Sequence, residues 1–209
     1  MKKLIKYILI LAVIGLVGYK SIYIKKLSEV KKIEGQKFDA VTYTGKLWDE
    51  KLPAKLDSSI ELGTLIGFIE ANPLDAFSRF SNAIGIGNYR YSLVRVNGVV
   101  AVINEDDVTL KVSHADSVMT IKIATEFVYG NAIRDASGLV DIKDFTNTND
   151  LNSISEELNK RVRTTVLPAF RTQVKQGDEI ELTGAVQFNK EHISFMDLEI
   201  IPIRIKILK

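Results

Sequence analysis

The change in hydrophobic period at Tyr89 constrains the fold of this chain more than any other feature. Before Tyr89, apolar residues recur every three or four positions, as in amphipathic helices. From Tyr89 on they alternate with polar residues, which is the period of half-buried strands. The segments "YRYSLVRV" and "VVAVI" flank Asn97-Gly98, a dipeptide that predicts a hairpin because a type I′ turn needs positive φ at both central positions. We therefore expect a strand-rich domain over residues 88–209.

The later segments indicate how these strands are connected. "NEDD" (104–107) predicts a turn into "VTLKV", "MTIKIATEFV" predicts another strand, and residues 178–188 and 193–207 predict two more. Between them, about residues 151–167 have the apolar spacing of one amphipathic helix, which Pro168 should kink or end. A helix between the third and fourth strands is the order of the five-stranded OB-fold barrel. The predicted fold class is therefore α+β with an OB-like five-stranded β-barrel, and the alternative is an α+β sandwich of the same elements.

Residues 33–87 predict a helical subdomain in front of the barrel. Pro53 is expected to end a first helix, and Asn72-Pro73 to separate two later ones. Ser58 followed by Glu61 has the spacing of a capping box.

Residues 1–32 predict a signal-anchor or signal peptide with a charged stem. Lysines precede the apolar run Tyr7–Tyr19, and Leu4–Ile24 gives about 21 residues, enough to span a bilayer if Lys20 extends to the interface. No cleavage signature of small residues follows the run. We expect a periplasmic protein anchored to the inner membrane by this N-terminal helix; the alternative is a cleaved, soluble periplasmic protein.

The net charge of +2 conceals an uneven distribution. Residues 1–32 contain eight Lys and one Glu, whereas the remainder contains 20 Lys and Arg against 25 Asp and Glu. The domain itself is therefore mildly acidic, which argues against nucleic acid as a partner, because such sites need basic surfaces.

A polar block, residues 129–150, holds the candidate site. Arg134 beside Asp135 fits a bidentate anchor for a carboxylate, phosphate or vicinal diol, with Asn131 adding a polar contact. The alternative is that Arg134 bridges Asp135, Asp141 or Asp144 and only holds the segment in place.

The segment Asp144–Asn147 also has two interpretations. It is typical of an Asx-type turn that leads into the helix, with Phe145 in the core. Alternatively, Asn147 faces a ligand beside Arg134. The candidate ligand-binding residues are Gly130, Asn131, Arg134, Asp135, Asp144 and Asn147.

Catalytic and metal-binding patterns are absent from the sequence. His114 and His192 have no ligand partner at helical spacing, and no nucleophile-elbow or calcium-loop motif occurs. We therefore expect no enzyme, no cofactor and no metal. The remaining catalytic hypothesis is a hydrolase that uses the acidic cluster 105–107.

The same polar block also carries a family resemblance. "GNAIRDASGL", "DFTN", Leu158-Asn159 and "GDEIELTGA" resemble the bacterial predicted periplasmic lipoproteins of unknown function, over about Phe38 to the C-terminus. The family pattern falls on Gly130, Arg134, Asp135, Asp144, Phe145, Asn147, Leu158 and Asn159. The resemblance implies an envelope location and, because many such proteins are encoded beside sugar ABC-transporter components, a role near sugar uptake. The chain has no Cys, so the lipid anchor in the family's name cannot apply here.

Two functions are consistent with these features. The first is a non-enzymatic, membrane-tethered periplasmic module that assists solute uptake by binding a small carbohydrate or a sugar ABC-transporter component. The second is a structural or scaffolding envelope protein that binds no small ligand and contacts other proteins through the helical subdomain.

Overall fold

The computed structural model describes residues 5–7, 10, 13, 38–114 and 117–208. The predicted N-terminal anchor and stem lie almost entirely outside these residues. Across the described part of the chain, no helix has the length and apolar character needed to cross a membrane. Residues Asp39–Lys209 form one compact unit, and the following description concerns that unit.

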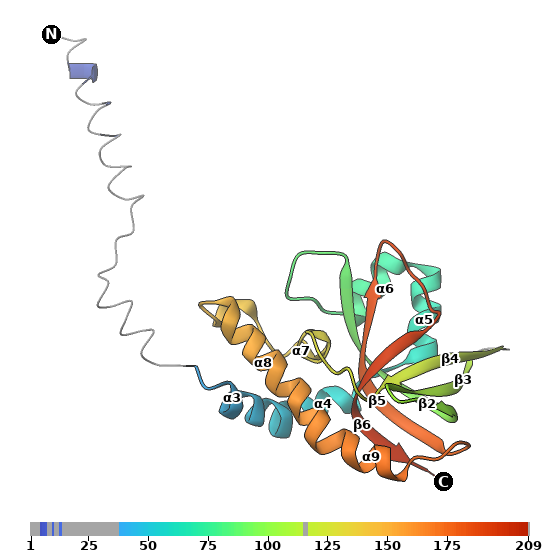
Figure 1. The fold of residues 1–209 in the computed structure, drawn as a ribbon. Helices are drawn as coiled ribbons and strands as arrows, with labels where there is room; N and C mark the ends of the chain where they lie inside the picture. Colours follow the sequence, from blue (N-terminus) through green and yellow to red (C-terminus); the bar gives the residue numbers. More distant parts are fainter. Residues whose placement is uncertain (1–4, 8–9, 11–12, 14–37, 115–116, 209) are drawn as a thin grey trace. The chain divides into compact units, whose positions relative to one another are not determined.

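A six-stranded sheet closed on itself forms the centre of the unit (Figure 1). Its strands follow the order β1-β2-β3-β4-β6-β5, and β5 pairs again with β2, so that five strands make a ring. The strands are β1 (Ile60–Glu61), β2 (Tyr89–Ile103), β3 (Asp107–His114), β4 (Ser117–Ala124), β5 (Glu179–Asn189) and β6 (Leu198–Ile207). The helices of the polar block and of residues 148–173 come between the third and fourth strands of the ring. The α+β class and the OB-like strand order are thus confirmed.

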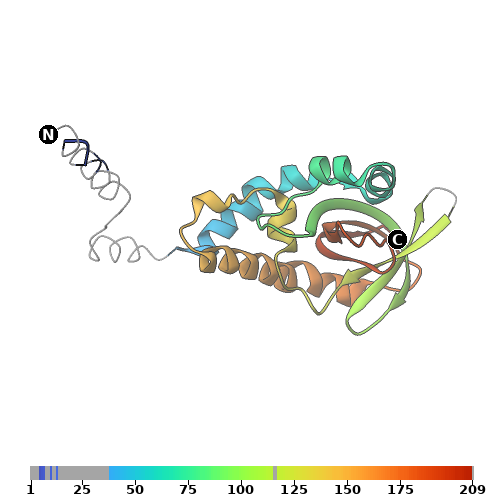
Figure 2. The same ribbon diagram turned by 90° about the horizontal axis from the view of Figure 1, so that it is seen from above.

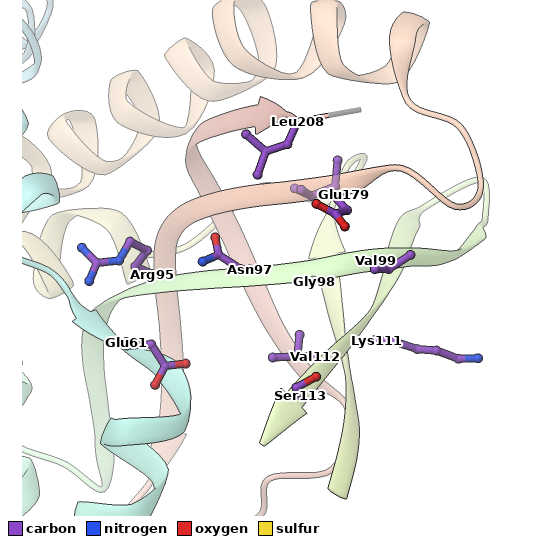
Figure 3. Close-up of a pocket in the computed structure, with 11 residues that line it drawn as sticks. Glu61, Arg95, Asn97, Gly98, Val99, Lys111, Val112, Ser113, Glu179 and Leu208 are labelled. Carbon is purple, nitrogen blue, oxygen red and sulfur yellow. The ribbon is translucent and has the colours of Figure 1, made fainter. Parts of the chain in front are cut away.

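The predicted hairpin at Asn97-Gly98 is wrong, because β2 is one continuous strand of 15 residues. Both residues pair with β5, and Figure 3 shows the strand passing through them without a turn. Gly98 has a different role: a Cβ there would lie 2.8 Å from the backbone oxygen of Lys111 on β3. Beyond this point β2 pairs with β3, from Val99↔Lys111 to Ile103. Gly98 therefore permits β2 and β3 to approach closely at the point where β2 begins to pair with β3.

The prediction that Pro53 ends its helix is wrong, and Pro168, which was expected to kink or end its helix, does not end it. The helix α3 (Ala40–Lys46) continues through a π-helical turn (Leu47–Lys51) into α4 (Leu52–Asp57), with Pro53 at the start of α4. The long helix repeats this arrangement: α8 (Thr148–Arg161), a π-helical turn (Val162–Val166) and α9 (Leu167–Gln173), with Pro168 at the start of α9. A π-turn places the proline ring one residue further from the carbonyl that it would strike in a regular helix, so the chain continues.

Two further helices, α5 (Leu62–Ala71) and α6 (Pro73–Phe80), follow β1. The N-cap of α5 is Glu61, whose carboxylate accepts hydrogen bonds from the backbone N–H groups of Gly63 and Thr64 at 2.9 and 2.6 Å. Ser58 instead ends α4, so the expected capping box is not formed. Helix α3 packs against α8 along one side of the unit (Figure 2). The apolar faces of these elements bury the core, including Leu65, Leu110, Ile121, Ile123, Ile154, Leu158 and Ile180.

Candidate functional site

The polar block is more ordered than its composition suggests. Gly130 turns the chain with a positive φ of 79°, and the short helix α7 (Ala132–Ser137) follows, with all six residues buried. Gly138 ends α7 in the left-handed region, with φ 60°. Helix α7 contacts β2, β5 and α8, so the first half of the block is part of the packed structure.

Arg134 and Asp135 form a buried ion pair. Their exposed fractions are 5% and 4%, and Nε of Arg134 donates to Oδ1 of Asp135 at 2.7 Å. Nη1 of Arg134 also donates to the carbonyl oxygen of Leu151 at 3.1 Å, which joins α7 to the first turns of α8. The structure therefore shows the pairing of Arg134 with Asp135 that was given above as the alternative to a ligand anchor.

The pair also holds the segment that follows α6. The backbone N–H of Ile84 lies 3.4 Å from Oδ2 of Asp135, and the side-chain amide of Asn82 donates to the carbonyl of Ala136 at 3.2 Å. Residues 82–84 thus lie against α7 although they are about 50 positions away in the sequence. Burial, and secondarily the charge of Asp135, raises the pKa of Tyr91, so this tyrosine stays neutral over the physiological range.

A hollow of about 290 Å³ opens beside the ion pair. We call it the Arg134 hollow. It is lined by residues 83–87, by Tyr89 and Tyr91 of β2, by Asn131, Arg134 and Asp135, and by Ile142, Thr148, Leu151 and Asn152. Two tyrosine rings, two amides and an ion pair with no net charge thus converge on one space.

Asn131 and Gly130 lie where α8 holds the chain before α7. Oδ1 of Asn131 accepts a hydrogen bond from Ser155 at 3.2 Å, and the amide of Asn159 donates to the carbonyl of Gly130 at 2.8 Å. Asn159 is 4% exposed, and its own Oδ1 has no hydrogen-bond partner among the described residues. Asn159 therefore tethers α8 to the chain before α7.

Asp144 and Asn147 do not line the Arg134 hollow. Asn147 is the N-cap of α8: its Oδ1 accepts from the backbone N–H of Asp150 at 3.0 Å, and its amide donates to the Asp150 carboxylate at 2.9 Å. Asp144 ends an exposed 3-10 turn (Ile142–Asp144). Phe145 is only half-buried, and its ring meets Tyr43 edge to face at 5.6 Å. Three of the six predicted residues, Asn131, Arg134 and Asp135, line the Arg134 hollow, whereas Gly130, Asp144 and Asn147 do not.

Sequence reasoning missed the aromatic and amide walls of the hollow. Tyr89 and Tyr91 were assigned only to a strand, and Asn152 only to a helix. Their positions in the sequence carry no signal of a site, because residues 83–91 and residues 131–152 meet only in the fold. Among the described residues, no group of three or more Asp, Glu or His side chains is arranged to hold a metal ion.

The comparisons with known proteins agree with this architecture. Residues 12–206 match the family described as "Predicted periplasmic lipoprotein (DUF2291)". The chain belongs to this family of periplasmic proteins, whose function is unknown. A search of curated proteins found no significant match.

Solved structures support the fold. A crystal structure of an OB-fold protein from Thermotoga maritima matches with a TM-score of 0.72 at 24% sequence identity, covering 82% of this chain and 99% of that chain. This likeness establishes an OB-fold. An OBody bound to hen egg-white lysozyme matches with a TM-score of only 0.27 at 13% identity, over 61% of this chain and 87% of that chain, and carries no argument.

Proposed function

We propose that the protein is a non-enzymatic periplasmic module that binds a small neutral carbohydrate in the Arg134 hollow and thereby assists solute uptake. One observation carries this proposal: a buried ion pair with no net charge forms part of a hollow that two tyrosines and two amides also line. The resemblance to proteins encoded beside sugar transporters supports the same direction.

The chemistry of the ion pair suits a vicinal diol. A guanidinium has five N–H donors, and two of them are used in the bonds of Arg134 to Asp135 and Leu151. A carboxylate has about four acceptor positions, and Asp135 uses two of them among the described residues. Donors and acceptors therefore remain side by side, as the adjacent hydroxyls of a sugar require. The absence of net charge gives no preference for phosphates.

The second part of the proposal is a membrane tether. The apolar run Tyr7–Tyr19, flanked by lysines, supports an inner-membrane anchor that keeps the domain in the periplasm. The test is cell fractionation with protease: the intact chain should stay with the inner membrane while its domain is digested from the periplasmic side. Recovery of the intact chain in the soluble periplasmic fraction would contradict the tether.

The binding test is a thermal-shift panel on the full-length protein with mono- and oligosaccharides, sugar phosphates and nucleotides. A ligand at about 100 times its Kd stabilises the fold by about 2.7 kcal/mol. For a chain of this size that corresponds to roughly 5–11 °C in Tm. We expect a neutral carbohydrate to give this shift.

Two variants of the same residue type make the result specific. Asn152 lines the hollow, whereas Asn149, three positions earlier on α8, does not. We expect Asn152→Ala to abolish the carbohydrate shift and Asn149→Ala to keep it. Equal shifts in both variants, or no shift with any neutral sugar in the wild type, would refute the proposal.

A second candidate function is scaffolding through protein contacts. Leu74 on α6 and Ile86, between Gly85 and Gly87, are strongly exposed apolar side chains near the helical segment. A photo-reactive amino acid at position 74 would test it, because a scaffold that uses α6 should form a defined cross-linked species in cells. Absence of any cross-linked species would exclude contacts at this surface.

A further inference from the structure

A second hollow shares Asn131 with the Arg134 hollow, but neither Arg134 nor Asp135 lines it. We call it the Tyr129 hollow, and its volume is about 410 Å³. It is bounded by the segment 127–132, by side chains of β5 and β6, and by the loop that precedes β6. Its lining residues are Phe127, Tyr129, Gly130, Asn131, Ala132, Ala185, Gln187, Ser194, Met196, Asp197, Leu198, Glu199 and Ile201.

Three large apolar side chains in this hollow remain exposed. The exposed fractions are 60% for Phe127, 64% for Tyr129 and 81% for Met196. Single exposed apolar residues are common on proteins, but a group of them around a concave surface marks a binding site. Tyr129 is also held in place, because the guanidinium of Arg163 lies 5.2 Å from the centre of its ring and donates to the carbonyl of Val128. The ring can therefore receive a ligand with little loss of side-chain freedom.

The charged residues that line the hollow are all acidic. Asp197 and Glu199 are its charged lining residues, and none of the thirteen is Lys, Arg or His. Outside the lining, two basic side chains lie nearby: Lys122, which acts on Glu199 and pairs with Asp107 at 4.0 Å, and Arg163, whose guanidinium lies 5.2 Å from the centre of the Tyr129 ring. Burial, together with the charge of Asp107, raises the pKa of Glu199, and the charge of Lys122 opposes this rise.

Aromatic side chains beside two carboxylates are an arrangement that recognises a cation with an apolar body. An anion would meet two like charges. We propose that the Tyr129 hollow binds an organic cation, an alkylammonium or guanidinium group, with Phe127 and Tyr129 against the cation and Asp197 and Glu199 balancing its charge. Such a group can come from a free small molecule or from a basic side chain of a polypeptide.

The methyl group of Met196 provides a direct readout of the site. The chain contains only three methionines, and Met119 on β4 serves as an internal reference outside the hollow. The full-length protein, labelled with [13C-methyl]methionine, is titrated with choline and separately with 3,3-dimethylbutan-1-ol, which has the same shape without the charge. We expect choline to shift the Met196 resonance to saturation without moving Met119. The neutral alcohol should require about tenfold or more higher concentration, since it lacks the electrostatic part of the interaction.

Matched variants test the charge. Asp197 has a positive φ of 54°, which Asn tolerates, so Asp197→Asn combined with Glu199→Gln removes both charges with little change in backbone or volume. This double variant should weaken choline binding about tenfold or more. Glu156→Gln, a carboxylate outside this hollow, should leave choline binding unchanged.

The outcomes separate clearly. Equal responses to choline and the neutral alcohol, or an unchanged affinity in the double variant, would overturn the proposal. If the double variant unfolds, the exposed side chains still decide, because Phe127→Leu should then weaken binding of choline. Titration with Nα-acetyl-lysine amide and with a short lysine-containing peptide identifies the source: a preference for the peptide assigns the cation to a polypeptide, and a preference for choline to a small molecule.

Discussion

Removal of the Arg134 side chain should be among the most destabilising single changes in the domain. Arg134→Ala deletes the bonds to Asp135 and to the Leu151 carbonyl, and it leaves a carboxylate that is 4% exposed without its counter-charge. Loss of one partner of a buried ion pair typically costs about 3–5 kcal/mol. For a chain of this length we expect Tm to fall by roughly 6–20 °C.

The single tryptophan makes the measurement direct. Trp48 is half-buried in the first π-turn, so its fluorescence should follow urea-induced unfolding of the full-length protein. Arg79→Ala is the matched control, because Arg79 pairs with Asp75 at 3.3 Å on the surface and its loss should cost less than about 1 kcal/mol. A double variant, Arg134→Met with Asp135→Leu, should recover part of the loss because no unpaired charge remains buried. A cost below about 1 kcal/mol for Arg134→Ala, or a double variant no better than it, would refute the reasoning.

Two further predictions concern the cap of α5 and the strand crossing. Although burial acts to raise it, hydrogen bonds from Gly63 and Thr64 lower the pKa of Glu61. The stabilising effect of this carboxylate should therefore be complete above its unfolded pKa of about 4.3 and be lost as pH falls through the lower folded value. Melting curves of wild type and Glu61→Gln should accordingly differ at pH 7 and converge on acidification. Equal separation at all pH values would contradict this assignment. Gly98→Ala should lower Tm, because its Cβ would meet the backbone of β3. Gly67 lies on the exposed face of α5 with no atom within 4 Å of its Cβ position, so Gly67→Ala should raise Tm and increase the free energy of unfolding by about 1 kcal/mol. The opposite order would show that the close approach at Gly98 is not rigid.

The strand order was predictable because alternation survives wherever one face of a strand is buried. The turn 104–107 was also predictable, and the N–H of Asn104 donates to the carbonyl of Asp107 at 2.8 Å. At Asn97-Gly98 the same local signal misled, because pairing of β2 with β5 through this point outweighs the turn preference of the dipeptide. That pairing joins residues about 80 positions apart, and no local pattern contains it.

The two prolines could have been interpreted correctly from spacing. Directly before each proline stands a buried leucine, and the preceding buried apolar residue lies five positions earlier: Leu47 before Leu52, and Val162 before Leu167. Regular helices use steps of three and four, so a step of five indicates an inserted residue, which a π-turn accommodates. Both places read Leu-Pro-Ala after the step.

The candidate site was predictable in part. Arg134 and Asp135 were singled out because two adjacent opposite charges can either anchor a ligand or pair with each other. The structure shows that they pair. Their common hollow was not predictable, since residues 83–87, which also line it, come before the first strand of the ring. The Tyr129 hollow was not predictable for a similar reason, because the loop that contains Met196 and Asp197 lies more than 60 residues further along the chain than Tyr129.

The long helix connects two regions of the protein mechanically. Residues 148–173 rise about 39 Å at 1.5 Å per residue. One end, at Thr148 and Asn152, forms a wall of the Arg134 hollow. The other end is fastened by Arg171, which pairs with Glu126 at 2.6 Å. The π-turn Val162–Val166 lies between these two ends. A single helical element therefore links a wall of the Arg134 hollow to the segment that follows β4.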